Sequence, residues 1–164
     1  MPSASPIEKH IIVALVDNKP GVVSRISGLF TRRGYNIESF VTCITTRPEI
    51  YHLTITVIST REELDLLIHQ LGRVMEVISI FPAGERACVV RELMLLRLSA
   101  KAAGENGFGK LIETLGLKIA ASSGESLIIE ASGDGERLEA ILRALSPFGI
   151  QKLIRSGAIA LEIE

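Results

Sequence analysis

The chain is poor in several residue types that mark specialised proteins. Its 164 residues include no tryptophan, two cysteines and only 4% aromatic residues. Because Cys43 and Cys88 lie far apart in a chain that opens without an apolar secretory leader, we expect no disulfide framework and a cytoplasmic location. The aliphatic run from Ile11 to Val16 is far too short to cross a bilayer, so no membrane span is predicted.

Charge of one sign is not in excess either. Lysine and arginine number 18 against 19 aspartate and glutamate residues, and the isoelectric point is near 6.3. A surface of this kind is not suited to neutralising phosphates, so neither a nucleic acid nor a membrane is an expected partner. Hydrophobic residues, in contrast, make up 47% of the chain, and the mean hydropathy of +0.35 is high for a small soluble monomer. We therefore expect another chain to cover part of the apolar surface.

The spacing of apolar residues in the first half predicts four strands and two helices. Val22, Ile26 and Phe30 repeat at helical spacing, and Gly34 is a typical residue at the end of a helix. Residues 1–8 hold two prolines and little apolar material, which indicates a flexible tail. The expected elements are a strand at Ile11–Leu15, a helix from Val22 to Gly34, strands at Tyr35–Thr46 and Ile50–Ser59, a helix from Thr60 to Gly72 and a strand at Val74–Phe81.

The second half repeats this order. The apolar stripe of the second helix recurs later in the chain, with Leu64, Leu67, Ile68 and Leu71 matched by Leu138, Ile141, Leu142 and Leu145. The expected elements are a strand at Leu93–Leu98, a loop and helix within Gly104–Leu115, a hairpin of Leu117–Ala121 and Leu127–Ala131, a helix capped by Asp134 and a final strand at Ala158–Ile163.

Each half thus follows the order βαββαβ. This order is typical of the ferredoxin-like fold, in which two helices cover one face of a four-stranded antiparallel sheet. We predict an α+β protein with two such domains in tandem, at residues 9–82 and 91–164, joined by a linker at residues 83–90.

The candidate site in the first half is the loop from Asp17 to Gly21. Unpaired backbone N–H groups and the helix dipole favour an anion at the start of a helix, and a free amino acid offers a carboxylate. Gly21 has no side chain to block the approach of such a group, and the Asn18 amide can bond a ligand. The alternative is that Asn18 caps the helix and Gly21 only packs.

A second asparagine, Asn36, follows the first helix at the entry to a strand. One interpretation is that asparagine tolerates unusual backbone geometry at this point. The other is that Asn36 faces Asn18 across a ligand, either within one chain or from a neighbouring subunit. The residues alone do not decide between these interpretations.

No other group of residues predicts chemistry. His10, His52 and His69 stand alone without cysteine or histidine at metal-ligand spacing, so we expect no metal site. The glycine-rich segment Gly104–Gly109 lacks the Lys-Ser/Thr of a phosphate-binding loop and is interpreted as a flexible loop. We find no nucleophile beside a base and no convincing carboxylate pair, and therefore predict no catalytic residue.

Three segments resemble a known family, the small regulatory subunits of acetolactate synthase, also called acetohydroxyacid synthase. The first is DNKPGVVSRISGLFTRRGYNIES, which begins at Asp17 and matches the family pattern N-x-x-G, S-R-x-x-G-L-F and R-G-Y-N-I-E-S. The other two are VRELMLLRL, from Val90, and IRSGAIAL, from Ile154. The resemblance covers nearly the whole chain and implies that the first domain is an ACT domain, the amino-acid-sensing form of the ferredoxin-like fold.

The resemblance also implies a function in the biosynthesis of valine, leucine and isoleucine. The chain would be non-catalytic and cofactor-free, and would activate a large catalytic subunit that holds thiamine diphosphate, Mg²⁺ and FAD. Valine would inhibit the complex from a site between two paired ACT domains of a homodimer. Its contacts carry over to Asn18, Gly21 and Asn36, supported by Lys19, Pro20 and Val22 in the loop and helix start.

The sequence departs from the family pattern at three places, where Lys19-Pro20, Val89 and Tyr51-His52 replace more usual residues. Competing expectations are a free-standing ACT-type amino-acid sensor without an enzyme partner, a small enzyme of the same fold and a purely structural dimerisation module. The preference among valine, leucine and isoleucine, the strength of inhibition and the assembly beyond a dimer stay open.

Overall fold

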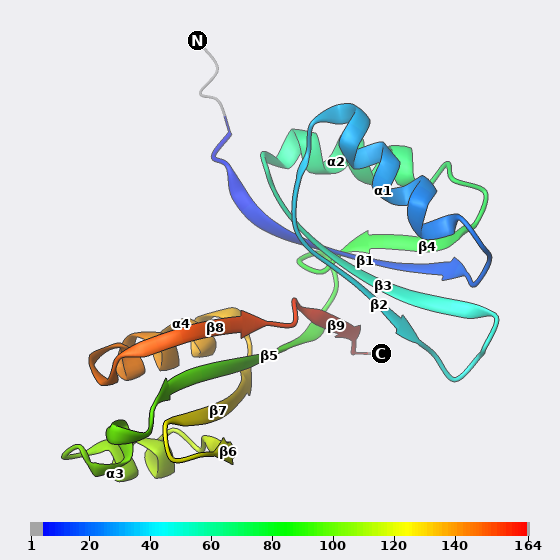
Figure 1. Ribbon diagram of the computed structural model, residues 1–164. Helices are drawn as coiled ribbons and strands as arrows, with labels where there is room; N and C mark the ends of the chain where they lie inside the picture. Colours follow the sequence, from blue (N-terminus) through cyan, green and yellow to red (C-terminus); the bar gives the residue numbers. More distant parts are fainter. Residues whose placement is uncertain (1–4, 164) are drawn as a thin grey trace. The chain divides into compact units, whose positions relative to one another are not determined.

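A computed structural model describes residues 5–163 and divides them into two compact units (Figure 1). The first unit contains the chain up to Val89 together with the C-terminal segment from Gly157, and the second runs from Val90 to Ser156. Both follow the expected order, so two tandem ferredoxin-like units in an α+β protein are confirmed.

The first unit contains one four-stranded antiparallel sheet and two helices. Its strands are arranged in the order β2-β3-β1-β4. The elements are β1 (Glu8–Asp17), α1 (Val22–Arg33), β2 (Asn36–Ile44), β3 (Ile50–Ser59), α2 (Arg61–Leu71) and β4 (Val77–Pro82). Both helices lie on the same face of the sheet (Figure 1). The fourth strand begins three residues later than the expected Val74, because Val74 and Val77 take part in backbone turns.

The core of this unit lies between the sheet and the helices. Alternate residues of β1 and β3 point into it, as a strand with one buried face requires, and the apolar stripes of α1 and α2 complete it. Its fully buried members include Ile12, Leu53, Ile55, Ile26, Phe30, Leu64 and Leu67.

Local capping fixes the ends of the helices as predicted. Thr60 accepts a hydrogen bond from the Glu63 backbone N–H, and the Glu63 side chain accepts one from the Thr60 N–H, which is a complete capping box for α2. Gly34 ends α1 in the left-handed conformation, at φ 70°, and donates to the last carbonyls of the helix.

The second unit repeats the architecture with the strand order β6-β7-β5-β8. Its elements are β5 (Cys88–Ser99), which begins in the first unit, a short 3₁₀ helix η1 (Ala100–Gly104), α3 (Phe108–Thr114), β6 (Lys118–Ser122), β7 (Ser126–Gly133), α4 (Gly135–Leu145), the 3₁₀ helix η2 (Ser146–Phe148) and β8 (Ile150–Arg155). Its separate core includes Met94, Leu96, Leu98, Ile129, Leu138 and Ile141. The glycine-rich segment interpreted as a flexible loop contains the end of η1 and the start of α3.

The last part of the chain differs from the sequence prediction. The fourth strand of the second unit is β8, a segment to which no strand was assigned, whereas the expected final strand at Ala158–Ile163 is the short β9 (Ile159–Glu162). The residues from Gly157 onward belong to the first unit, and β9 pairs with β5, which begins inside the expected linker. The physical reason is pairing and packing: β8 pairs with β5 from Leu98 opposite Ile150 to Met94 opposite Arg155, and Ile150 packs against the core of the second unit. Arg155 also forms ion pairs with Glu92 and Glu139.

Candidate functional site

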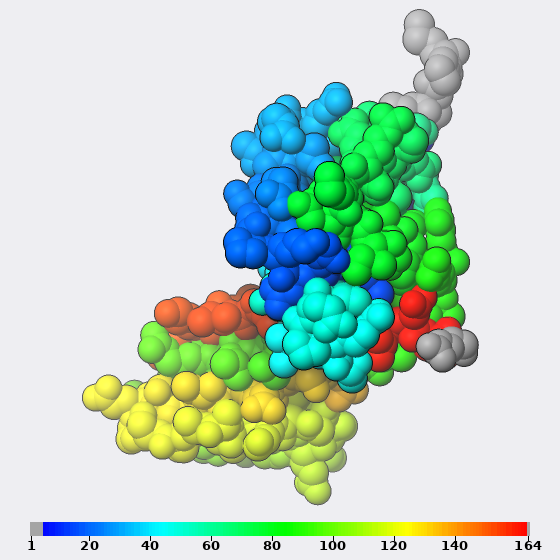
Figure 2. All heavy atoms as spheres, turned by 90° about the vertical axis from the view of Figure 1, so that its right-hand side faces the viewer, coloured from blue at the N-terminus to red at the C-terminus, as the bar shows by residue number. Residues whose placement is uncertain are grey.

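The loop between β1 and α1 is held by backbone and side-chain bonds to its neighbours. The backbone N–H of Asn18 donates to the Glu49 carbonyl at 2.8 Å, and the Asn18 amide nitrogen donates to the Pro48 carbonyl at 2.8 Å. These bonds join the loop to the turn between β2 and β3, and the two turns lie side by side on the face seen in Figure 2. The hydrogen bonds therefore hold the loop in one conformation, and it lies close to the surface.

The start of α1 has no side-chain cap. Its N-cap residue is Gly21, at φ 84°, and the first turn contains no acidic residue. Asn18 does not cap the helix, so this part of the alternative interpretation is wrong. The helix instead presents uncompensated backbone N–H groups and the positive end of its dipole, which is an arrangement that favours an anion.

The neighbours of these two residues support the loop in different ways. Pro20 lies one position before the N-cap, where its ring fixes the backbone φ of the loop. The Lys19 ammonium bonds the Asp17 carboxylate, which raises the pKa of Lys19. Val22 is buried in the core and holds the first turn in place. Lys19 is therefore partly neutralised within the loop itself.

Asn36 is the first residue of β2 and is exposed. It pairs with Ile58 of β3, and its side chain forms no hydrogen bond to any residue within 5–163. A polar amide at this point is left free to bond a ligand or another chain, and its backbone φ is not positive. The interpretation based on unusual backbone geometry therefore has no support.

The structure does not bring Asn36 close to Asn18 within one chain. The two residues flank opposite ends of α1, whose 12 residues span about 18 Å at a rise of about 1.5 Å per residue. A small amino acid cannot reach both ends of such a helix. Gly21, in contrast, lies at the same end as Asn18, so the residues predicted to bind the effector form two separate groups in a single chain, called below the two predicted half-sites.

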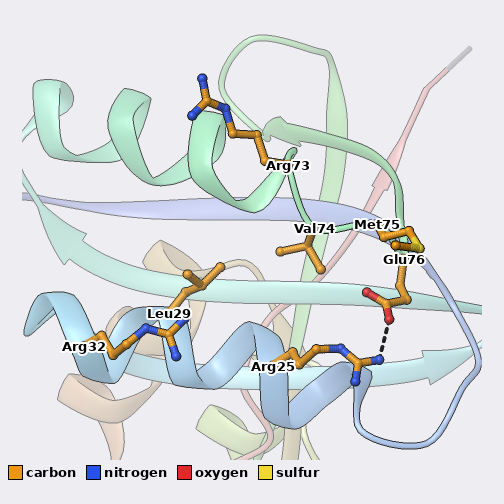
Figure 3. A pocket seen from close by; sticks show the side chains of 7 residues that line it. All are labelled: Arg25, Leu29, Arg32, Arg73, Val74, Met75 and Glu76. Carbon is orange, nitrogen blue, oxygen red and sulfur yellow. Dashed lines mark hydrogen bonds and ion pairs between the residues drawn. The ribbon is translucent and has the colours of Figure 1, made fainter.

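A shallow groove of about 500 Å³ lies beside the first half-site, between α1 and the turn that leads into β4 (Figure 3). Its lining residues are Arg25, Leu29, Arg32, Arg73, Val74, Met75 and Glu76. Arg25 forms an ion pair with Glu76, and an added Cβ on Gly21 would lie 3.2 Å from the Arg25 guanidinium. Arg25 and Glu76 thus lie behind the loop that contains Gly21. They are far apart in the chain, so no sequence pattern predicted their ion pair.

Other kinds of site are not evident in the described part of the chain. No cluster of histidine, cysteine, aspartate or glutamate within residues 5–163 is arranged to hold a metal ion. Among the same residues, none of the helices is long and apolar enough to cross a membrane. His52 is half-buried on β3, and burial lowers the pKa of its imidazole.

Comparisons with known proteins match each unit to the same kind of protein. A family model described as "AHAS small subunit-like ACT domain" matches residues 12–79, and one described as "Small subunit of acetolactate synthase" matches residues 91–164.

Whole-chain relatives agree with these matches. The acetolactate synthase small subunit of Mycolicibacterium smegmatis is 39% identical over 154 residues, which cover 92% of this chain and 89% of that protein. A probable acetolactate synthase small subunit of Archaeoglobus fulgidus is 36% identical over 153 residues, or 93% of this chain and 96% of that protein. The crystal structure of the acetolactate synthase small subunit of Thermotoga maritima superimposes with a TM-score of 0.81 at 28% identity, covering 96% of this chain and 99% of the other.

Proposed function

The chain belongs to the family of acetolactate synthase small subunits, and from this membership we propose that it is the non-catalytic regulator of an acetolactate synthase. It would bind and activate a large catalytic subunit in the biosynthesis of branched-chain amino acids. In this proposal the thiamine diphosphate, Mg²⁺ and FAD belong to the catalytic partner, and this chain contributes the binding of an effector.

The proposed effector is valine, bound between the first units of two copies. Its carboxylate would lie at the uncapped start of α1, where Gly21 leaves room and the helix dipole favours negative charge. The Asn18 amide oxygen would accept a hydrogen bond from the ammonium group, since the amide nitrogen already donates to Pro48. The remaining polar contact would come from Asn36 of the other copy.

The observation that carries this proposal is the separation of Asn18 and Asn36 by the full length of α1. One small ligand can meet both residues only if a second copy brings its Asn36 to the Asn18 of the first. Such a site is complete only in a dimer, which joins ligand binding to the way in which the two copies dock.

Two copies could dock by pairing their β2 strands at the edge of each sheet. β2 is an outer strand of the sheet, so its outer backbone groups are available to another strand. β1 and β2 both run antiparallel to β3 and therefore run in the same direction, so α1 leads from the end of β1 back to the start of β2. Antiparallel pairing of two β2 strands would therefore place the start of one α1 beside the end of the other α1, which is the arrangement that the two half-sites require.

Regulation then needs only a difference in valine affinity between two states of the complex. A coupling of about 1–3 kcal/mol is typical of such systems. Valine that bridges the two copies would favour one mutual docking of the first units, and the large subunit would sense that docking. A free-standing amino-acid sensor would use the same site but would act on no enzyme.

Calorimetric titration with valine tests the site. Asn18→Ala and Asn36→Ala each remove hydrogen bonds to a charged ligand group, and a loss of about 1.5–3 kcal/mol weakens binding by roughly ten- to a hundredfold. Asn106→Ala, in the corresponding loop of the second unit, is the matched control and should bind valine as the natural chain does. Unchanged affinity in both site variants would exclude this assignment.

Mixing the chain with the large subunit tests the function. Acetolactate formation should rise when the chain is added and fall again when valine is added. An enzyme whose rate does not respond to the chain, while the chain still binds valine, would favour the free-standing sensor.

A further inference from the structure

The sheet of the second unit has a bare face opposite its helices. The registers define its cross-strand rows, because residues directly opposite each other on neighbouring strands point to the same side. One row contains Lys118, Glu130, Leu95 and Ile154, and the next contains Ala121, Ile128, Arg97 and Lys152. We refer to these eight residues as the outer face of the second sheet.

The centre of this outer face is apolar and open. Leu95 and Ile154 lie directly opposite each other on β5 and β8, and their exposed fractions are 36% and 55%. Leu93, one step along β5, is 41% exposed, and Ile128 lies beside Arg97 on β7. Neighbouring exposed aliphatic side chains on a rigid sheet are typical of a surface that another molecule covers.

The charges on the outer face are uneven. Lys118 lies directly opposite Glu130, so this pair adds no net charge to the face. Arg97 lies directly opposite Lys152, and neither side chain forms an ion pair with a residue in the described part of the chain. Like charges in such a cross-strand pair destabilise a sheet unless something of the opposite charge approaches them. The face therefore carries an uncompensated positive pair at the edge of an apolar centre.

We propose that the outer face of the second sheet binds the large catalytic subunit, through a surface of that partner that presents carboxylates next to apolar side chains. The carboxylates would lie against Arg97 and Lys152, and the apolar side chains against Leu95 and Ile154. This inference rests on the proposed function for the identity of the partner. It adds which part of the chain meets that partner and what chemistry the opposing surface must have.

Charge favours this occupant over a second copy of the chain. Two outer faces packed against each other would bring two positive pairs into one interface, and like charges brought together suppress such a contact. Acidic groups of a partner would neutralise the two positive charges and so relieve the repulsion between Arg97 and Lys152. Arginine is also enriched at protein interfaces, where its guanidinium binds carboxylates through two hydrogen bonds.

The test measures binding of the full-length chain to the purified large subunit by sedimentation or surface-immobilised titration. The double variant Arg97→Glu/Lys152→Glu should bind roughly a hundredfold more weakly, since reversal replaces attraction by repulsion. Binding by the natural chain should weaken with added salt more steeply than binding by Arg97→Gln/Lys152→Gln. The uncharged change Ile154→Ser should weaken binding by about tenfold, as expected when a buried apolar contact is lost at an interface.

Controls separate docking from folding and from effector binding. Lys101→Glu/Lys110→Glu makes the same change of charge on η1 and α3 of the same unit and should bind the large subunit normally. Circular dichroism should be unchanged in every variant, and valine calorimetry should match that of the natural chain.

Two results would overturn the assignment of this face. The first is natural affinity for the large subunit in both Arg97→Glu/Lys152→Glu and Ile154→Ser. The second is a change in self-association of the chain with partner binding intact, which would make the face a contact between copies. Failure of the proposed function has a different signature, because the natural chain itself would then not bind or activate the large subunit.

Discussion

The two units share one strand order, but within residues 5–163 only the first has both faces of its sheet covered by the chain itself. In the first unit the face opposite the helices is covered by the segment from Gly157 to Ile163, and Thr54 and Thr56 on that face are 1% and 3% exposed. In the second unit the corresponding face leaves Leu95 and Ile154 open. The same fold thus produces a closed sheet and an open one, which shows that coverage, rather than topology, distinguishes the units.

Small residues make this coverage possible. An added Cβ on Gly157 would lie 2.7 Å from the Ser39 Cβ and 2.9 Å from the Val41 Cγ2, so the backbone rests directly on β2. Ala158 and Ala160 are buried, and the Ala160 N–H donates to the Thr54 hydroxyl at 3.3 Å. The C-terminal segment is therefore an integral layer of the first unit, on the strand that begins with Asn36.

The largest expected effect comes from Gly157→Val, which would break this layer. Gly157 has a φ of 82°, and the side chain would also clash with Ser39 and Val41. Strain and displacement together should destabilise the first unit by roughly 3 kcal/mol. Both tyrosines, Tyr35 and Tyr51, lie in the first unit and the chain has no tryptophan, so tyrosine fluorescence during urea unfolding reports on that unit alone.

The control for this variant is Gly124→Val in the turn between β6 and β7. No atom lies within 4 Å of an added Cβ there, and Gly124 has no positive φ. Its unfolding midpoint should stay close to that of the natural chain. If Gly157→Val unfolded at the same urea concentration, the segment would not be packed on the sheet.

A smaller effect is expected from Thr54→Val, which keeps the shape of the side chain and removes the hydroxyl. The buried Ala160 N–H would lose its acceptor, at a cost of about 1–2 kcal/mol. Thr42→Val on the exposed part of β2 is the matched control and should change stability by less than about 0.5 kcal/mol. Equal unfolding free energies in the two variants would show that the hydrogen bond contributes nothing.

The difference between the units also explains what could be predicted from the sequence. Local patterns were sufficient for the first unit, where Val22, Ile26 and Phe30 at helical spacing are the buried residues of α1. They failed at the end of the chain, because Ala158–Ile163 is more apolar than Ile150–Arg155 and therefore resembled the missing strand. The two segments differ in their partners, because Ile150–Arg155 pairs with β5 in the second sheet whereas Ala158 and Ala160 are buried in the first unit. In both cases the partner is distant in sequence, so no local pattern indicates it.

The candidate site, too, could be predicted where its residues are close together in the chain. Asn18 and Gly21 are close in the chain, so their common position at the start of α1 followed from the loop itself. The ion pair of Arg25 with Glu76 joins residues 51 positions apart, and no local pattern indicates it. The helix predicted between Val22 and Gly34, in contrast, already places Asn18 and Asn36 at its opposite ends, which is the geometry that calls for a second copy.

The two kinds of helix start in this fold also differ: α1 and α3 have glycine at the N-cap and no side-chain cap, whereas α2 and α4 are capped by a side chain. Asp134 caps α4 by accepting a hydrogen bond from the Arg137 N–H at 2.9 Å, whereas Asn18 makes no such bond to α1. Asp134→Ala should therefore cost about 1 kcal/mol of stability, and Asn18→Ala, which removes only the exposed hydrogen bond to Pro48, about 0.5 kcal/mol. Thermal unfolding of the two variants checks this order. A larger loss for Asn18→Ala would give that residue a structural role in place of the proposed one.

The smallest effect concerns His52, which shares the covered face of the first sheet with Glu162 of the C-terminal segment. Burial lowers the pKa of the imidazole, and the Glu162 carboxylate opposes this shift in part. Because the unfolded chain then takes up the proton first, the free energy of unfolding should fall as the pH drops below the ordinary histidine pKa of about 6.5. His52→Gln should flatten this fall between pH 7 and about 5.5, whereas Glu162→Gln should steepen it, and the exposed His69→Gln serves as the matched substitution. Urea unfolding at several pH values measures the slopes, and an unaltered slope in Glu162→Gln would mean that the segment does not lie over His52.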